Sequence, residues 1–137
     1  MKRIAWMAAM AVMLFLPALA SAQTQQKINK KNLVIKEWNT SARSNKKILD
    51  HVTTYNSDGQ KIEEIEYSTE GQKWRKRFEY DGGGKASREL VYNERNKLVE
   101  VKKFEYNEFG RKKIQYLYNA SGKLLTIKVF EYITEDA

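Results

Sequence analysis

The chain has 137 residues, of which 31% are charged, and its 25 Lys and Arg against 17 Asp and Glu give a net charge of +8. This length fits a single domain. The chain contains no cysteine, which excludes disulfide bonds and thiol chemistry.

The N-terminus has the pattern of a secretory signal peptide, which we place at residues 1–22. Two basic residues precede an apolar run over 4–16, and Ala20-Ser21-Ala22 forms a small-residue cleavage site. The run is shorter than the ~20 apolar residues that a membrane-spanning helix needs. We therefore predict export to the periplasm or the cell exterior, with no membrane span after cleavage.

The rest of the chain predicts one β domain. Residues 23–31 are polar, basic and aperiodic, which indicates a disordered lead-in to a single hairpin-repeat domain over 32–137. No segment keeps a helical period. Short segments bounded by turn residues predict eight strands, at about 33–38, 47–55, 60–67, 72–80, 85–92, 97–106, 111–118 and 123–133.

The predicted fold class is all-β, an antiparallel up-and-down meander of about eight strands. Short loops join the strands, so consecutive strands are expected to pair. We favour an open, twisted sheet or a half-barrel, because the short apolar side chains that fill a small barrel are present only in part. A closed small barrel, which would remove the two edge strands, is the alternative.

One six-residue phrase is repeated six times: Tyr, a short polar residue, two free positions, Gly or Asn, and then Lys, Arg or Gln. The copies begin at Tyr55, Tyr67, Tyr80, Tyr92, Tyr106 and Tyr118. Asn, Asp or Ser at the second position can bond the amide two residues on, and Gly or Asn tolerates a positive φ. Each copy therefore predicts a type I turn closed by a left-handed residue, a common hairpin loop.

The spacing of the tyrosines predicts the two faces of the sheet. Because an even spacing keeps each Tyr on the same face, we expect one aromatic face and one mostly charged face. The 13-residue step from Tyr67 to Tyr80 predicts either a four-residue loop there or a bulge between Gln72 and Tyr80. The aromatic face is read from the residues two positions before each Tyr: Thr53, Ile65, Phe78, Leu90, Phe104, Tyr116 and Phe130.

The C-terminal half departs from this division. Apolar residues stand there at positions of the otherwise charged face: Val99, Val101, Leu117, Leu125, Ile127 and Val129. Large exposed apolar patches are uncommon on monomers. We expect the sheet to curl over itself in this region, and the alternative is that a partner covers it.

The repeated phrase resembles the Tyr-Asp (YD) repeats of Rhs-type and teneurin-type proteins. It is similar also to short secreted bacterial proteins of unknown function that are built from the same turn. The resemblance covers Tyr55 to Tyr132, and the literal dipeptide stands at Tyr80-Asp81. It implies an array of β-hairpins in a secreted setting. Six turns are too few for the hollow shell that Rhs proteins form around a toxin.

The chain offers little for catalysis. His51 is the only histidine, and neither a Cys nor a Ser-His-Asp phrase accompanies it. Glu63, Glu64 and Glu66 could face a sugar, but Glu stands before Tyr in four strands, as cross-strand pairing with bases would produce. We expect no enzyme activity, no cofactor and no metal site.

Basic residues beside tyrosines at the turns form the candidate binding surface. Alternate turns of a meander lie at the same end of the sheet, which gathers bases there. A basic rim with aromatic rings suits an acidic glycan, and the alternative is that these bases only keep the turns soluble. The candidate ligand-binding residues are Tyr80, Tyr106, Tyr132, Lys85, Arg111, Lys112 and Lys113.

Two functions stay open from the sequence. The first is a secreted, non-catalytic module that binds a glycan or a protein of the cell envelope or the cell exterior. The second is a structural or assembly protein that associates through its sheet edges or its C-terminal apolar strands, including as a homo-oligomer. Nucleic acid is not an expected partner, because acids are interleaved with bases throughout an exported chain.

Overall fold

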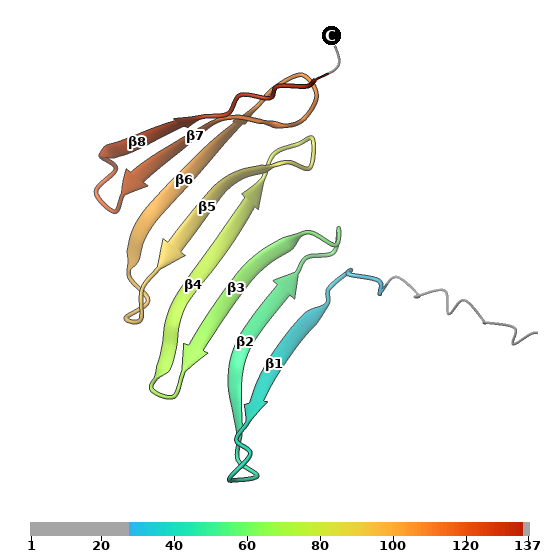
Figure 1. Cartoon of the computed structure of the whole chain (residues 1–137), viewed down its shortest axis with the longest axis vertical. Helices are drawn as coiled ribbons and strands as arrows, with labels where there is room; N and C mark the ends of the chain where they lie inside the picture. The colour runs from blue at the N-terminus through green and yellow to red at the C-terminus, as the bar shows by residue number, and fades with distance from the viewer. Residues whose placement is uncertain (1–27, 136–137) are drawn as a thin grey trace, which may run out of the picture.

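The computed structural model describes residues 28–135, which form one antiparallel sheet of eight strands in chain order (Figure 1). The strands are β1 (Val34–Thr40), β2 (Lys47–Tyr55), β3 (Lys61–Ser68), β4 (Gly71–Tyr80), β5 (Ala86–Tyr92), β6 (Leu98–Tyr106), β7 (Lys112–Asn119) and β8 (Leu124–Val129). The expected all-β meander is confirmed. The predicted signal peptide lies outside the described residues.

The sheet is open and twisted. Each strand pairs with its neighbours in the chain, so β1 and β8 are the two edges, and the strand direction turns steadily from β1 to β8 in Figure 1. The closed small barrel is therefore wrong. The structure has no helix within residues 28–135.

The repeated phrase forms the predicted hairpin loops. Asn56 Oδ1 accepts from the Asp58 amide at 3.0 Å, and Asn93 Oδ1 accepts from the Arg95 amide at 3.0 Å. The left-handed position has a φ of 81° at Gly84 and 60° at Asn96. Short polar side chains and residues that tolerate positive φ thus shape the loops, as the turn chemistry predicts.

The loop between β3 and β4 is shorter than the others, with Tyr67 paired to Gln72. The expected four-residue loop is therefore wrong. The alternative, a bulge after Gln72, is confirmed, because Glu66 pairs with Trp74 and leaves Lys73 as an extra residue. A register shift lies beside the tyrosine in each of the other five repeat hairpins too.

Aromatic side chains lie on both faces of the sheet, which corrects the expected single aromatic face. The bulge in a hairpin adds one residue and inverts the alternation of side chains on the next strand. Phe78 lies opposite Glu89, whereas Leu90 lies opposite Arg77 and Val101. We call the two surfaces the His51 face, with Thr53, Phe78, Phe104 and Phe130, and the Tyr92 face, with Ile65, Leu90 and Tyr116.

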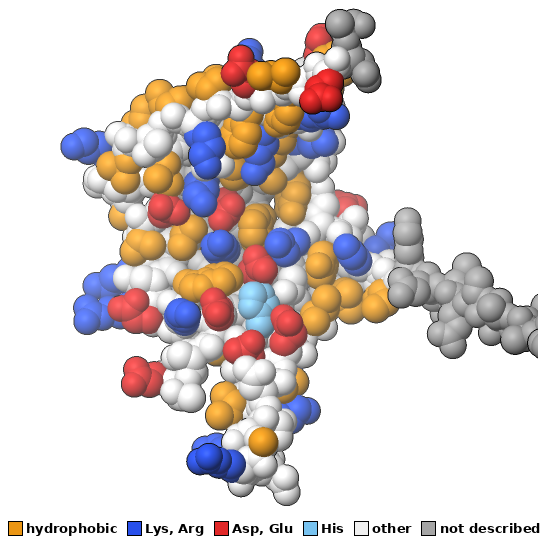
Figure 2. All heavy atoms as spheres, viewed as in Figure 1, with side chains coloured by type: hydrophobic (Ala, Val, Ile, Leu, Met, Phe, Trp, Pro, Cys, Tyr) orange, Lys and Arg blue, Asp and Glu red, His pale blue; other side chains and the backbone are white. Residues whose placement is uncertain are grey.

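The sheet is a single layer. Within residues 28–135 no hydrophobic side chain is buried, and Thr53, at 8% exposed, is the one buried residue. Sheets normally bury an apolar face against a second layer. Here the hydrophobic, basic and acidic side chains are interleaved over the face seen in Figure 2, so cover must come from neighbouring side chains.

Long basic side chains supply that cover. Ten Lys or Arg groups of the described residues lie 4.3–6.0 Å from the centroids of aromatic rings. Because the methylene stems of Lys and Arg can lie on apolar surface while the charge stays in water, these contacts substitute for part of a second layer.

Acidic side chains also bind basic side chains across the strands. Arg88 binds Glu79 through two hydrogen bonds of 2.8 Å, and Arg75 lies 3.2 Å from Glu63. The expected pairing of charges across strands is therefore confirmed at these pairs. Exposed pairs of this kind stabilise a fold by only ~0.2–1 kcal/mol each, so the backbone ladder remains the main support.

Of the six apolar residues of the C-terminal half that the sequence places on the charged face, four are exposed: Val99, Leu125, Ile127 and Val129. The expected curling over is wrong, because the sheet stays open and β8 is its last strand. Leu117 lies on the His51 face, opposite Lys102. Of the other five apolar residues, Val101, Ile127 and Val129 lie on the Tyr92 face. Val99 and Leu125 are the extra residues of bulges.

Candidate functional site

The loops that follow β2, β4 and β6 lie side by side at one end of the sheet, which we call the turn end (Figure 1). Tyr80, Tyr106 and Tyr132 lie there, as do Lys85, Arg111, Lys112 and Lys113. The structure thus brings all seven candidate ligand-binding residues to one end of the molecule, in an order set by the strand order.

The three tyrosines are used to join successive hairpins. The hydroxyl of each donates to a backbone carbonyl at the start of a neighbouring strand: Tyr80 to Lys61 at 2.6 Å, Tyr106 to Ala86 at 2.6 Å and Tyr132 to Lys112 at 2.7 Å. The repeated bond shows that these side chains support the array. Their hydroxyls are therefore already occupied.

Basic side chains lie over two of these rings. Lys85 Nζ lies 6.0 Å from the centroid of Tyr106, and the Arg111 guanidinium lies 5.4 Å from that of Tyr132. Lys85 also crosses the next loop, where a Cβ added to Gly110 would lie 3.1 Å from the end of its side chain. Each base thus packs on the following repeat.

The two remaining candidates have separate environments. Lys112 Nζ lies 4.3 Å from the ring of Phe104. Lys113 is the extra residue of the bulge that starts β7, and its carbonyl accepts from the Phe130 amide at 3.0 Å. The Lys112 carbonyl also accepts the hydrogen bond of Tyr132, so the seven residues form a row of packing contacts.

Burial changes the acidity of the tyrosines at the turn end. Burial raises the pKa of Tyr80 above its usual value, and the neighbouring Tyr55 raises it further. Burial also raises the pKa of Tyr106, with added effects from Asp81 and Tyr80. In both cases the neutral hydroxyl is favoured, which is the form that can donate to a carbonyl.

His51 lies among carboxylates on its face of the sheet. It stands opposite Glu37 on β1 and Glu66 on β3, and its Nε2 lies 3.2 Å from Glu64 Oε1. Glu64 also binds Lys61 at 3.3 Å. Glu64 thus joins His51 and Lys61 in one side-chain network, and among residues 28–135 no group of His, Asp and Glu is placed to hold a metal ion.

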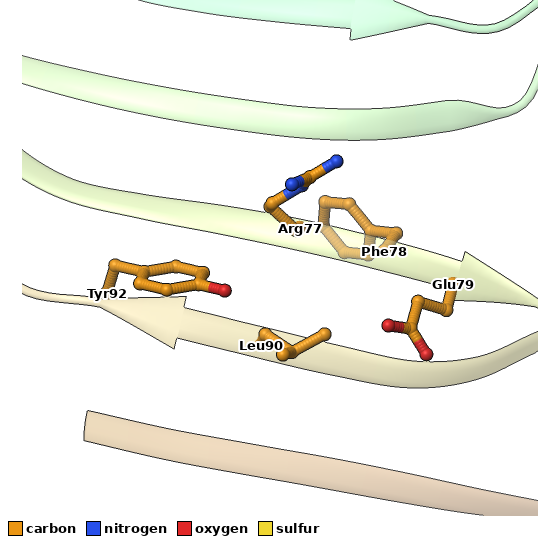
Figure 3. A pocket seen from close by; sticks show the side chains of 5 residues that line it. All are labelled: Arg77, Phe78, Glu79, Leu90 and Tyr92. Atoms are coloured by element: carbon orange, nitrogen blue, oxygen red, sulfur yellow. The ribbon is translucent and has the colours of Figure 1, made fainter. Parts of the chain in front are cut away.

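The hollows of the surface are shallow. One of about 150 Å³ lies between β4 and β5, lined by Arg77, Phe78, Glu79, Leu90 and Tyr92 (Figure 3). Another of about 210 Å³ lies beside the loop from β7 to β8. Sites for small molecules usually have about 300–1,000 Å³, so neither hollow has the size of a substrate pocket.

The C-terminal strand presents a continuous exposed surface. Every residue of β8 is exposed, including four aliphatic ones: Leu124 at 42%, Leu125 at 55%, Ile127 at 53% and Val129 at 71%. On the Tyr92 face Ile127 lies opposite Tyr116, and Val129 lies opposite Ile114. These side chains, with Val101 and Tyr118 next to them, form what we call the C-terminal apolar surface.

Residues 29–32 form a further turn that the sequence analysis did not predict. The Lys31 amide donates to Asn29 Oδ1 at 3.0 Å, and Asn32 has a φ of 54°, two features that the hairpin loops share. The backbone bond that closes this turn runs from the Leu33 amide to the Lys30 carbonyl at 3.2 Å. The turn falls in the segment expected to be a disordered lead-in; residues 23–27 of that segment lie outside the described residues.

This turn packs on the first hairpin loop as the other loops pack on one another. The Asn32 amide donates to the Asn56 carbonyl at 2.9 Å, and Lys30 lies 5.5 Å from the ring of Tyr55. The signal was present as Asn-Lys-Lys-Asn, but Ile28 stands in place of the tyrosine. The phrase that begins with tyrosine therefore does not include this turn.

Comparisons with known proteins add no assignment to this geometry. No protein-family model matches the chain, and no curated protein matches it. No helix in the described part of the chain is long and apolar enough to cross a membrane.

Proposed function

We propose that this protein is a non-catalytic structural module whose chains assemble through the C-terminal strands. The observation that carries the proposal is the part of the C-terminal apolar surface that lies on β8, where Leu124, Leu125, Ile127 and Val129 are 42–71% exposed. Exposed apolar surface of this kind on a folded chain is typical of interaction sites. Export, as the predicted signal peptide implies, would place the assembly outside the cytoplasm.

The turn end supports a glycan-binding function less well. Stacking of a sugar needs an open aromatic face, whereas the rings of Tyr106 and Tyr132 lie under Lys85 and Arg111. Each of the three tyrosine hydroxyls already donates to a carbonyl. The residues that the sequence singled out as a binding surface are therefore better explained as contacts between repeats.

Changing Val129 to Lys tests the proposed assembly. Val129 is 71% exposed, so the chain should fold, while a charge there opposes burial against a partner. We expect the purified protein to sediment as a multimer and the variant as a monomer, in sedimentation velocity runs over a series of protein concentrations.

Ile133→Lys provides the matched control. Ile133 is also aliphatic, is 84% exposed and lies beyond the end of β8. The Ile133→Lys substitution should leave the sedimentation coefficient of the wild type unchanged. A wild-type protein that sediments as a monomer at every concentration would contradict the proposal, and so would equal dissociation by both substitutions.

A further inference from the structure

The outer edge of β8 has backbone groups ready to pair with another strand. The Phe130 amide donates to the Lys113 carbonyl at 3.0 Å, so the backbone N–H group of Phe130 points toward β7. Hydrogen-bonding direction alternates along an antiparallel strand. Ile127 and Val129 therefore point their N–H and C=O groups toward the open edge, where no described residue pairs with them.

The two edges of the sheet are protected to different degrees. β1 carries two charged residues, Lys36 and Glu37, and charged side chains on an edge strand discourage strand addition. β8 has Lys128 as its one charged residue and no proline. An exposed apolar edge strand is a site for pairing with another chain, and β8 fits that description better than β1.

We infer that the partner of β8 is the β8 strand of a second copy of this chain, paired antiparallel about a two-fold axis through Ile127. This inference rests on the proposed assembly and specifies its geometry. In this register Ile127 lies opposite the partner's Ile127, Leu125 opposite the partner's Val129, and Thr126 opposite the partner's Lys128. The two C-terminal apolar surfaces then meet as one surface.

Side-chain chemistry selects this register over its neighbours. A shift that centres the axis on Lys128 places two like charges directly opposite each other, which is destabilising. A shift that centres it on Thr126 places Val129 opposite the partner's Lys123. Both leave Leu125, Ile127 and Val129 less well matched, whereas the register through Ile127 pairs aliphatic with aliphatic residues at all three positions.

A two-fold contact also closes the assembly. The same strand is used by both copies, so pairing ends at a dimer. Pairing of β8 with the β1 strand of another copy would instead be head-to-tail and would extend into a filament. The protected β1 edge argues for the closed form, a continuous sheet with a β1 strand at each outer edge.

Single cysteine substitutions test the register, because the chain contains no cysteine of its own. Residues opposite each other in such a pair are ~5.5 Å apart at Cα, within the range that a disulfide spans. With oxidised glutathione as the oxidant, Ile127→Cys should form a covalent dimer by itself. Thr126→Cys should form about tenfold less, since its counterpart is two residues away from the opposite position.

A mixture of two cysteine variants provides an independent test of the register. Thr126→Cys mixed with Lys128→Cys should cross-link, although each alone should not. Efficient cross-linking of Thr126→Cys alone would overturn the register, and filaments in place of dimers would show β8 paired with β1. A wild-type dimer in which none of these variants cross-links would overturn the inference and leave the proposed assembly standing, whereas a monomeric wild type would overturn both.

Discussion

At the scale of single residues, the tyrosines that close the strands connect one hairpin to the next. Tyr106 illustrates this: its hydroxyl donates to the Ala86 carbonyl at 2.6 Å, and Lys85 covers its ring. Because a sheet of one layer has no interior, such contacts between neighbours replace the burial that normally positions a side chain. We therefore propose that the residues which resemble a sugar-binding platform in sequence serve as contacts between repeats.

Tyr106→Phe should lower the free energy of unfolding by ~1 kcal/mol, because it removes one hydrogen bond and keeps the ring. Urea unfolding followed by circular dichroism measures the change. Tyr92→Phe is the control, since no hydrogen bond of the Tyr92 hydroxyl occurs within residues 28–135. An equal loss in both variants would contradict the role of the bond to Ala86.

The Tyr106→Phe substitution also tests the pH dependence of stability. The pKa of Tyr106 is raised in the folded protein, so above pH ~10 the unfolded chain loses this proton first and the folded state loses stability. The contribution is complete below that pH and disappears as pH rises through the folded-state pKa. Tyr106→Phe should therefore weaken the decline in unfolding free energy above pH ~10, and an unchanged decline in this variant would contradict the raised pKa.

At the scale of elements, the hairpin loop determines which face each strand presents. A loop closed by a left-handed residue is followed by a bulge, and the bulge moves the next strand's aromatic residues to the other face. Strands with the same sequence pattern thus point their side chains in opposite directions. The loop conformation is therefore as important for the surface chemistry as the strand sequence.

Gly122→Ala should destabilise the protein by ~1–2 kcal/mol, the cost of placing a Cβ in the left-handed region. Gly122 has a φ of +87° and no atom within 4 Å of an added Cβ, so backbone strain is the sole expected effect. Thermal unfolding measures it. Gly82→Ala, with equal space and no left-handed φ, should be neutral or slightly stabilising, and a loss there as large as at Gly122 would contradict the explanation.

At the scale of the whole molecule, the sheet is a linear array in which each strand contacts only its neighbours. Stability in such arrays is roughly a sum of repeat and nearest-neighbour terms, and the ends open first. A strand at an edge has one neighbour in place of two. The edges therefore combine low stability with exposed backbone, which is the physical basis for assembly through β8.

Amide hydrogen exchange should follow this arrangement. In dilute protein we expect the slowest exchange in β4 and β5 and the fastest in β1 and β8. At higher concentration the amides of β8 should become protected while those of β1 should not, if β8 pairs with its copy. Uniform protection across all eight strands at low concentration would contradict a linear array.

The repeated turn phrase determined much of this fold by itself. Hairpin loops follow from Asn or Asp before a residue that tolerates positive φ, and alternating strands follow from the short spacing, because both depend on interactions close in the chain. The residues 55–123 therefore predicted an all-β meander and its strand order. The same local chemistry also placed the basic and aromatic candidates at one end.

Only the tertiary structure determined which side chains share a face of the sheet, which rings are covered by basic side chains and which strands are edges. The bulge after each loop shifts the register by one residue, so the even spacing of the tyrosines does not predict the face on which each tyrosine lies. Whether Tyr106 is an open ring or a packed one depends on Lys85 and Ala86 in the preceding hairpin. The exposure of Ile127 and Val129 follows from the sheet remaining open, because closure depends on contacts between strands far apart in the sequence.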